Sequence, residues 1–131
     1  MKITASVRNS PTLHEVHVAT NGAAQSLSIP EKRSGKGSGV NGGEFLMLAL
    51  ATCYCNDVYR EAERLHIPVN AVFVEASADF PGPGLAATNI RYKARITSTA
   101  PDDVIADLLR QTDAVAEVHN TLRSGAAVTL E

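Results

Sequence analysis

The segment from Asn41 to His66 constrains the fold most, because it holds the longest apolar run and both cysteines. From Phe45 to Cys55 only Thr52 is polar, so a helix here is apolar on every face, as in a buried helix. The run is too short for a bilayer, which needs about 20 apolar residues. Charged residues then return at helical spacing. We therefore predict a helix over 44–66 that is buried in its first half and amphipathic in its second.

Length and composition indicate one domain. The chain has 131 residues and 44% hydrophobic content. A chain of this length is small for surrounding a helix that is apolar on all sides, and a second subunit would cover it, so we expect a homodimer. The net charge of -2, without a basic cluster, gives no reason to expect a nucleic-acid partner. The N-terminal residues lack the apolar core of a signal peptide, so we expect a cytoplasmic protein with no membrane partner and with reduced thiols.

The rest of the chain separates strands from helices, which predicts the α+β class. Alternating apolar residues, with turn signals such as Asn21-Gly22, predict an N-terminal β-meander and a later β-hairpin. Asp113 is expected to cap a helix that ends at Gly125. The expected single domain therefore comprises a meander at 1–29, a glycine-rich loop at 30–43, the central helix at 44–66, a β-hairpin at 70–98, helices at 100–124 and a closing strand at 126–130.

Two motifs near the central helix have structural explanations. Asn41 and Glu44 are spaced as a capping box, with Asn41 at the N-cap. The glycines from Gly37 to Gly42 match a nucleotide-binding pattern, but no apolar strand runs into them and no parallel βαβ unit follows. No pair of histidines or cysteines has the placement for local metal chelation. We therefore predict no cofactor and no metal site.

Cys53 is the strongest candidate for a reactive residue, and two interpretations of it stay open. As a nucleophile it must ionise, yet apolar surroundings raise the pKa of a thiol and the dipole at the helix start is about 13 Å away. Asp57, one turn on, disfavours the thiolate, and Arg60 on the same face can offset Asp57. A nucleophilic role therefore requires an arginine from elsewhere, with candidates at Arg8, Arg33, Arg91 and Arg95. The other interpretation is a small buried hydrophobe.

Cys55 and Glu44 also have two interpretations each. Cys55 lies about 200° around the helix from Cys53, so an intact helix cannot bring the two sulfurs to disulfide distance. Cys55 is then either structural or a resolving thiol that acts after local unwinding or across a dimer. Glu44 is either the capping acid alone or also a catalytic acid, although an ideal helix places it about 180° from Cys53.

The motifs GSGVNGGEFLMLALATCYCND, REAERLHIPV and VHNTLRSG resemble the OsmC-like family, which contains organic hydroperoxide resistance proteins and osmotically induced peroxidases. The resemblance implies antiparallel sheets around a long central helix and an intertwined homodimer. It also implies that Cys53 attacks the peroxide, helped by Arg8 and by Glu44, although the family acid often stands one residue earlier, at Gly43. Ala116 stands where the second, resolving cysteine is usual.

The predicted function is therefore a thiol-dependent peroxidase that reduces organic hydroperoxides at Cys53 in oxidative stress defence, with an external thiol as reductant. Its pocket should favour apolar organic peroxides over hydrogen peroxide. The pocket should be lined by apolar and acidic residues of the helix, namely Phe45, Leu46, Leu50, Tyr54 and Asp57. The alternative is a non-enzymatic member of the family that binds a small lipophilic or electrophilic molecule in the dimer pocket. The missing second cysteine and Gly43 favour this alternative.

Overall fold

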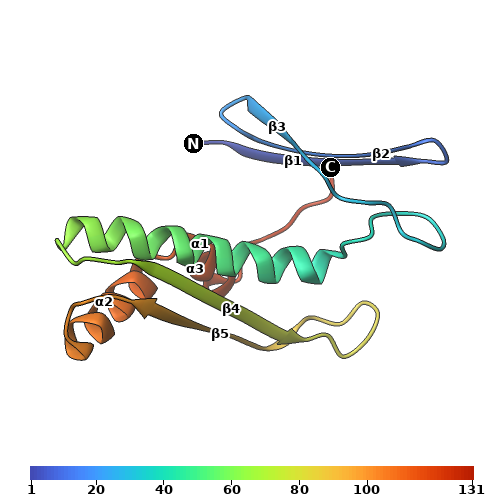
Figure 1. Ribbon diagram of the computed structural model, residues 1–131. Helices are drawn as coiled ribbons and strands as arrows, with labels where there is room; N and C mark the ends of the chain where they lie inside the picture. The colour runs from blue at the N-terminus through green and yellow to red at the C-terminus, as the bar shows by residue number, and fades with distance from the viewer. The chain divides into compact units, whose positions relative to one another are not determined.

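The computed structural model describes residues 1–131 and confirms the α+β class (Figure 1). The chain forms two compact units, residues 1–45 and residues 46–131. None of the helices is long and apolar enough to span a membrane.

The first unit contains the predicted meander. Strands β1 (Ile3–Ser10), β2 (Leu13–Thr20) and β3 (Ala23–Leu27) form an antiparallel sheet in the order β1-β2-β3. Asn21 and Gly22 connect β2 to β3 with φ angles of 49° and 84°. Two positive φ values in a two-residue loop match the strand twist, which is why Asn-Gly is favoured there. The hairpin predicted from this dipeptide is confirmed.

The glycine-rich loop after β3 has more order than its composition predicts. Glu31 and Ser38 form an isolated antiparallel bridge, and the Lys32 N–H donates to the Gly37 carbonyl at 2.9 Å. The Asn9 side-chain oxygen also accepts from the Gly37 N–H at 3.1 Å. Positive φ at Gly37, 105°, lets the chain reverse between the two bridge residues. Backbone and side-chain hydrogen bonds thus compensate for the missing apolar surface.

Helix α1 (Gly42–Arg64) begins with the predicted capping box. The Glu44 N–H donates to the Asn41 side-chain oxygen at 2.9 Å, and the Asn41 N–H donates to the Glu44 carboxylate at 2.7 Å. Two N–H groups that would otherwise lack partners at the start of the helix are thereby satisfied. The predicted helix at 44–66 is confirmed with each boundary shifted by two residues.

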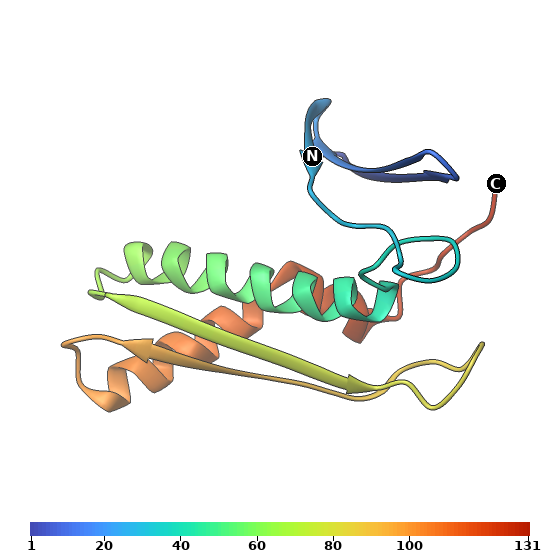
Figure 2. The same ribbon diagram turned by 45° about the vertical axis from the view of Figure 1, so that its right-hand side comes forward.

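The second unit is built on an antiparallel ribbon of β4 (Ala71–Asp79) and β5 (Thr88–Thr97), along which α1 runs in Figures 1 and 2. Alternate residues of the ribbon face the helices, and the Arg91, Lys93 and Arg95 side of β5 is exposed, as the sequence predicts. The core combines α1 with the helices that follow β5. Its buried members are Tyr54, Val58, Ala62, Leu108 and Ala116.

Helices α2 (Asp102–Val115) and α3 (Glu117–Ser124) meet at Ala116, which is completely buried. The prediction that Asp113 caps the last helix is wrong, because Asp113 lies in the final turn of α2 and accepts hydrogen bonds from Tyr92 and Arg123. The predicted strand at 126–130 is also absent, since no other strand of the chain pairs with this segment. Gly125 ends α3 with a φ of 63°, as predicted from its helix-terminating chemistry.

In a single chain the burial of α1 is concentrated in its second half, and the predicted burial of the first half between two subunits stays a prediction. In the apolar first half Leu48 is 57% exposed, and only Leu50 and Tyr54 are buried between Phe45 and Cys55. In the polar second half Asp57 and Glu61 are buried, because this part of the helix packs on the ribbon and α2 while Arg60 and Arg64 pair with the two acids. A single copy of the chain therefore leaves the most apolar stretch of its helix uncovered.

Candidate functional site

Cys53 lies in the middle of α1 and its thiol is half-buried. Residues four apart on a helix are neighbours, and the Cys53 thiol donates a hydrogen bond to Asp57 Oδ2 at 3.3 Å. Asp57 itself is buried, with only 4% of its surface exposed. The Cys53 sulfur therefore has a carboxylate as its nearest polar partner, as expected from the helix spacing. Cys55 is also a free thiol and half-buried.

The start of α3 contributes the other side of this site. Glu117 Oε2 lies 4.0 Å from the Cys53 sulfur, and a hydrogen bond from the Val118 backbone N–H acts to lower the pKa of the thiol. Neither residue was predicted, because each is more than 60 positions from Cys53 and carries no motif that points to it. Glu117 begins α3 directly after the buried Ala116, and its acid lies beside the sulfur.

Arg60 joins the two acids of the site. Its Nη1 lies 3.0 Å from Asp57 Oδ1 and 3.3 Å from Glu117 Oε1. The prediction that Arg60 offsets Asp57 is therefore confirmed by the ion pair. Arg60 makes no hydrogen bond to the Cys53 sulfur, so its charge neutralises the carboxylates and does not reach the thiol directly.

The electrostatics of the second unit keep Cys53 protonated. Burial raises the pKa of the thiol, and the charges of Asp57 and Glu117 raise it further. Burial also raises the pKa of the Asp57 carboxyl, against the opposing effects of the thiol hydrogen bond and Arg60. The resting group is thus a thiol hydrogen-bonded to a carboxylate.

Three atoms that could coordinate a metal ion, one each from Cys53, Asp57 and Glu117, lie within 4.8 Å of one another. Sequence reasoning found no metal site because Glu117 is distant in the chain. The arrangement has a sufficient explanation without an ion, since Arg60 already pairs with both carboxylates and the thiol is protonated. We interpret the cluster, named here the Cys53 cluster and comprising these three residues with Arg60, as an ion-pair network around a thiol.

The other predicted catalytic residues belong to the first unit. Arg8 lies in β1 opposite Glu15 of β2. Glu44 uses its carboxylate in the capping box, which accounts for the residue structurally. The catalytic roles of Arg8 and Glu44 stay predictions. Of the predicted pocket residues, Phe45 and Leu46 are half-buried, while Leu50 and Tyr54 are 2% exposed.

Tyr54 is a core residue with a hydrogen-bonded hydroxyl. It donates to the Leu109 carbonyl at 2.7 Å, and its ring lies 4.8 Å from the ring of Tyr92 and 5.6 Å from that of His119. The Tyr92 hydroxyl donates to Asp113, which also pairs with Arg123 at 2.6 Å. Burial and Asp113 raise the pKa of Tyr92 to about 12. These aromatic side chains connect α1 and β5 to α3.

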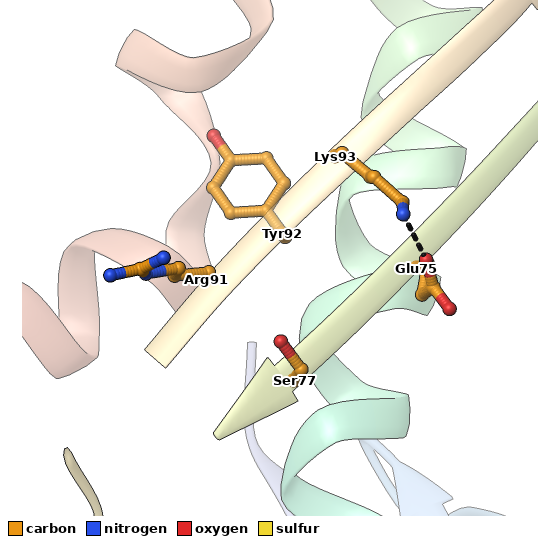
Figure 3. Close-up of a pocket in the computed structure, with 5 residues that line it drawn as sticks. All are labelled: Glu75, Ser77, Arg91, Tyr92 and Lys93. Atoms are coloured by element: carbon orange, nitrogen blue, oxygen red, sulfur yellow. Dashed lines mark ion pairs between the residues drawn. The ribbon is translucent and has the colours of Figure 1, made fainter. Parts of the chain in front are cut away.

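A surface hollow with a volume of about 300 Å³ lies on the β4–β5 ribbon. Figure 3 shows its lining and the ion pair of 2.6 Å between Lys93 and Glu75 that bridges the two strands. Both side chains are more than half exposed, and an exposed ion pair of this kind contributes little to binding or stability. Neither cysteine of the chain lines this hollow.

Three solved structures share this fold. They are an OsmC-like protein from Mycoplasma pneumoniae (18% identity, 93% of this chain and 86% of that chain covered, TM-score 0.64), the organic hydroperoxide resistance protein OsmC from Legionella pneumophila (15%, 94% and 90%, 0.62) and an organic hydroperoxide resistance protein from Elizabethkingia anophelis (15%, 92% and 88%, 0.59). At these identities the likeness establishes the fold.

The comparison by sequence is more specific. Residues 35–131 match the model of the OsmC-like protein family, so the chain belongs to that family. The match includes Cys53 and the whole of α1, β4, β5, α2 and α3. No curated protein sequence matches the chain. The resemblance seen in the sequence motifs is therefore confirmed.

Proposed function

We propose that this OsmC-like protein is a thiol-dependent peroxidase that reduces organic hydroperoxides at Cys53 and acts in defence against peroxide stress. The observation that carries the proposal is the Cys53–Asp57 hydrogen bond of 3.3 Å, which gives the thiol an adjacent proton acceptor on a rigid helix. Two solved relatives of the same fold are described as organic hydroperoxide resistance proteins, which supports the substrate class.

The reaction needs a proton transfer and the cleavage of one O–O bond. Asp57 accepts the thiol proton, and the sulfur attacks the terminal oxygen of the hydroperoxide ROOH. The O–O bond breaks, the sulfur becomes a sulfenic acid, and the alkoxide leaves as ROH after it takes the proton from Asp57. Burial raises the pKa of the Asp57 carboxyl, which makes it a stronger base towards the thiol proton than an ordinary carboxylate.

Arg60 and Glu117 set the charge around this step. Arg60 stabilises the carboxylate of Asp57 before the transfer, and the Val118 N–H stabilises charge on the sulfur. Glu117 opposes thiolate formation, so it keeps the resting cysteine protonated and less open to unspecific oxidation. That Arg8 adds a further positive charge to help Cys53 stays a prediction from the family resemblance.

The sulfenic acid has to be reduced by a thiol. Ala116 cannot supply one, and Cys55 lies around the helix from Cys53, so we propose an external thiol as reductant. Its sulfur attacks the sulfenic sulfur of Cys53 and releases water, and a second thiol then breaks the mixed disulfide. The net reaction consumes one hydroperoxide and two thiols and forms an alcohol, water and a disulfide.

The exposed apolar surface of the chain supports a homodimer as the working form. Leu48, which is 57% exposed, belongs to the apolar stretch of α1, and Phe73 of β4 is 51% exposed. Contiguous apolar surface on a single chain often marks an interface with another protein. Light scattering at micromolar concentration tests this: a mass of two chains is expected, and Leu48→Glu should reduce it to one.

The peroxidase proposal is tested by mixing the reduced protein with cumene hydroperoxide or hydrogen peroxide and following oxidation by intact mass. We expect faster oxidation by the organic peroxide, confined to Cys53, and loss of the fast phase in Cys53→Ser but not in Cys55→Ser. Asp57→Asn should slow the reaction although it removes a negative charge, because the proton acceptor is lost. Oxidation no faster than that of a free thiol refutes the proposal.

One observation favours the alternative, a family member that binds a small lipophilic molecule without turning it over. Burial and two carboxylates raise the pKa of Cys53, which is the opposite of what a peroxide-reactive thiol requires. The oxidation experiment separates the two functions. A thiol that stays inert to both peroxides, in a protein that binds small apolar molecules, would establish the alternative.

A further inference from the structure

We propose that Ala116 and Arg123, at the two ends of α3, are positioning residues for Cys53. Ala116 leaves the Val118 N–H free for the sulfur, and Arg123 holds α3 in the direction that points this N–H at it. The N–H groups in the first turn of a helix carry partial positive charge, which favours a thiolate over a thiol. The proposal deepens the proposed function and rests on it only in taking Cys53 as the reactive thiol.

Helix α3 begins without a side-chain cap. Ala116 is its N-cap residue, with extended backbone angles (φ −71°, ψ 103°) and no side-chain hydrogen bond to the helix. Ser, Thr, Asp or Asn is favoured at an N-cap, where the side-chain oxygen accepts from the N–H of the second or third helical residue. The second helical residue of α3 is Val118, whose N–H donates to the Cys53 sulfur instead. An alanine at the N-cap therefore leaves this donor to the thiol.

The other donor at the start of α3 is already used. The Glu117 N–H bonds to the carboxylate of its own residue, which lowers the pKa of that acid. The same carboxylate lies 4.0 Å from the Cys53 sulfur and 3.3 Å from the Arg60 guanidinium. The first turn of α3 thus faces the Cys53 cluster with one N–H on the acid and the next on the sulfur.

The far end of α3 is held by Arg123. Its Nη2 donates to Asp113 Oδ1 at 2.6 Å, and its Nη1 donates to the Asp113 carbonyl at 3.3 Å. The Tyr92 hydroxyl donates to the same carboxylate oxygen. One turn earlier in α3, the Asn120 side-chain nitrogen donates to the Ala114 carbonyl at 3.0 Å. These contacts tie the end of α3 to the last turn of α2 and to β5.

These polar contacts set the direction of α3. The helix has eight residues, which are too few for a helix that is stable by itself in water. His119 is its one buried residue and makes no hydrogen bond. Arg123 lies about 8 Å along the axis from Val118, so its ion pair acts on the orientation of the whole helix. Because a hydrogen bond weakens steeply when its angle departs from linear, a tilt of α3 weakens the Val118 bond to the sulfur.

Ala116→Ser tests the start of the helix, because the new hydroxyl competes with Cys53 for the Val118 N–H. The assay is alkylation by iodoacetamide between pH 6 and 10, followed on the Cys53 peptide by mass spectrometry, which gives the apparent pKa of this thiol alone. We expect the pKa to rise and the rate at pH 7.5 to fall about two- to fivefold, as for the loss of one helix-terminus interaction. Ala116→Gly also lacks an oxygen, so this control should react as the unmodified protein does.

Arg123→Met tests the other end, because it keeps the length of the side chain and removes the ion pair with Asp113. The rate at Cys53 should fall by a similar factor, and combining this variant with Ala116→Ser should lower it little further, since both act through one N–H. Arg123→Lys keeps the positive charge and should restore part of the rate, a recovery that a loss of packing alone does not explain.

The matched control for Arg123 is Arg110→Met. It breaks an ion pair between Arg110 and Asp107 that lies within α2 and does not hold α3. The alkylation rate and the apparent pKa of Cys53 should stay those of the unmodified protein.

Two outcomes overturn the proposal. One is an unchanged pKa of Cys53 in Ala116→Ser, which means that the Val118 N–H does not act on the thiol. The other is a full additive loss in the double variant, which means that Arg123 acts on the thiol by another route. If Arg123→Met fails to fold, Ala116→Ser and its control decide. Iodoacetamide is not a peroxide, so a failure here is distinct from a failure of the peroxidase function.

Discussion

Replacing His119 by phenylalanine should stabilise the protein. The histidine is 4% exposed with two unpaired nitrogens, so folding removes these atoms from water without replacing their hydrogen bonds. Phenylalanine has a similar shape and can keep the aromatic contacts at 4.4 Å and 5.6 Å. The free energy of unfolding should therefore rise by about 1–3 kcal/mol. This corresponds to about 4 °C in melting temperature per kcal/mol.

The same substitution should flatten the dependence of stability on pH. Because the pKa of His119 is lower in the folded protein, the unfolded chain binds a proton first as the pH falls below about 6.5. Stability that is present above this pH is thus lost as the pH falls towards the folded pKa. The loss from this group is at most about 1.4 kcal/mol per pH unit.

Urea unfolding of both proteins at pH 7.5, 6.5 and 5.5 measures both effects. The stability difference in favour of His119→Phe should widen as the pH falls. Tyr92→Phe is the matched control, because it removes a hydroxyl that is hydrogen-bonded to Asp113 and should lower stability by about 1 kcal/mol at every pH tested. If His119→Phe is less stable than the unmodified protein at all three pH values, the nitrogens have partners in solution and the reasoning is wrong.

The remaining predictions concern the core, the helix start and the thiol. Leu108→Ala, at a completely buried position, should cost about 2–5 kcal/mol of unfolding free energy in urea titrations. Asn41→Ala removes one bond of the capping box and should cost about 0.5–2 kcal/mol by the same measurement. Glu117→Gln should lower the pKa of Cys53, seen as faster alkylation by iodoacetamide at pH 7.5; an unchanged rate would show that the charge of Glu117 does not affect the thiol.

The Cys53 cluster shows which contacts can be predicted from sequence and which cannot. Cys53, Asp57 and Arg60 share one helix face, so their spacing was enough to expect an interaction, and the structure has the hydrogen bond and the ion pair. Glu117 and Val118 reach the thiol only because α2 and α3 fold back on α1. No local pattern encodes that return, so the second acid of the site was missed.

Asp113 and α1 show the same limit in the core. Asp113 has the residue type of a helix cap, but the position of Tyr92 and Arg123 makes it a hydrogen-bond acceptor at the end of α2 instead. For α1 the apolar pattern predicted burial of the first half, which a single chain does not provide. Which half the chain covers by itself was decided by where the β4–β5 ribbon and α2 pack.

The sequence by itself determined the local elements of this protein, because they depend on neighbouring residues: the Asn21-Gly22 turn, the capping box at Asn41, the long helix and the alternating strands of the ribbon. Its motifs were also sufficient to recognise the OsmC-like family. The tertiary structure alone decided which charges surround Cys53 and that His119 is buried without a partner. Both depend on the docking of α3, which brings together residues that are distant in the chain and that no periodicity connects.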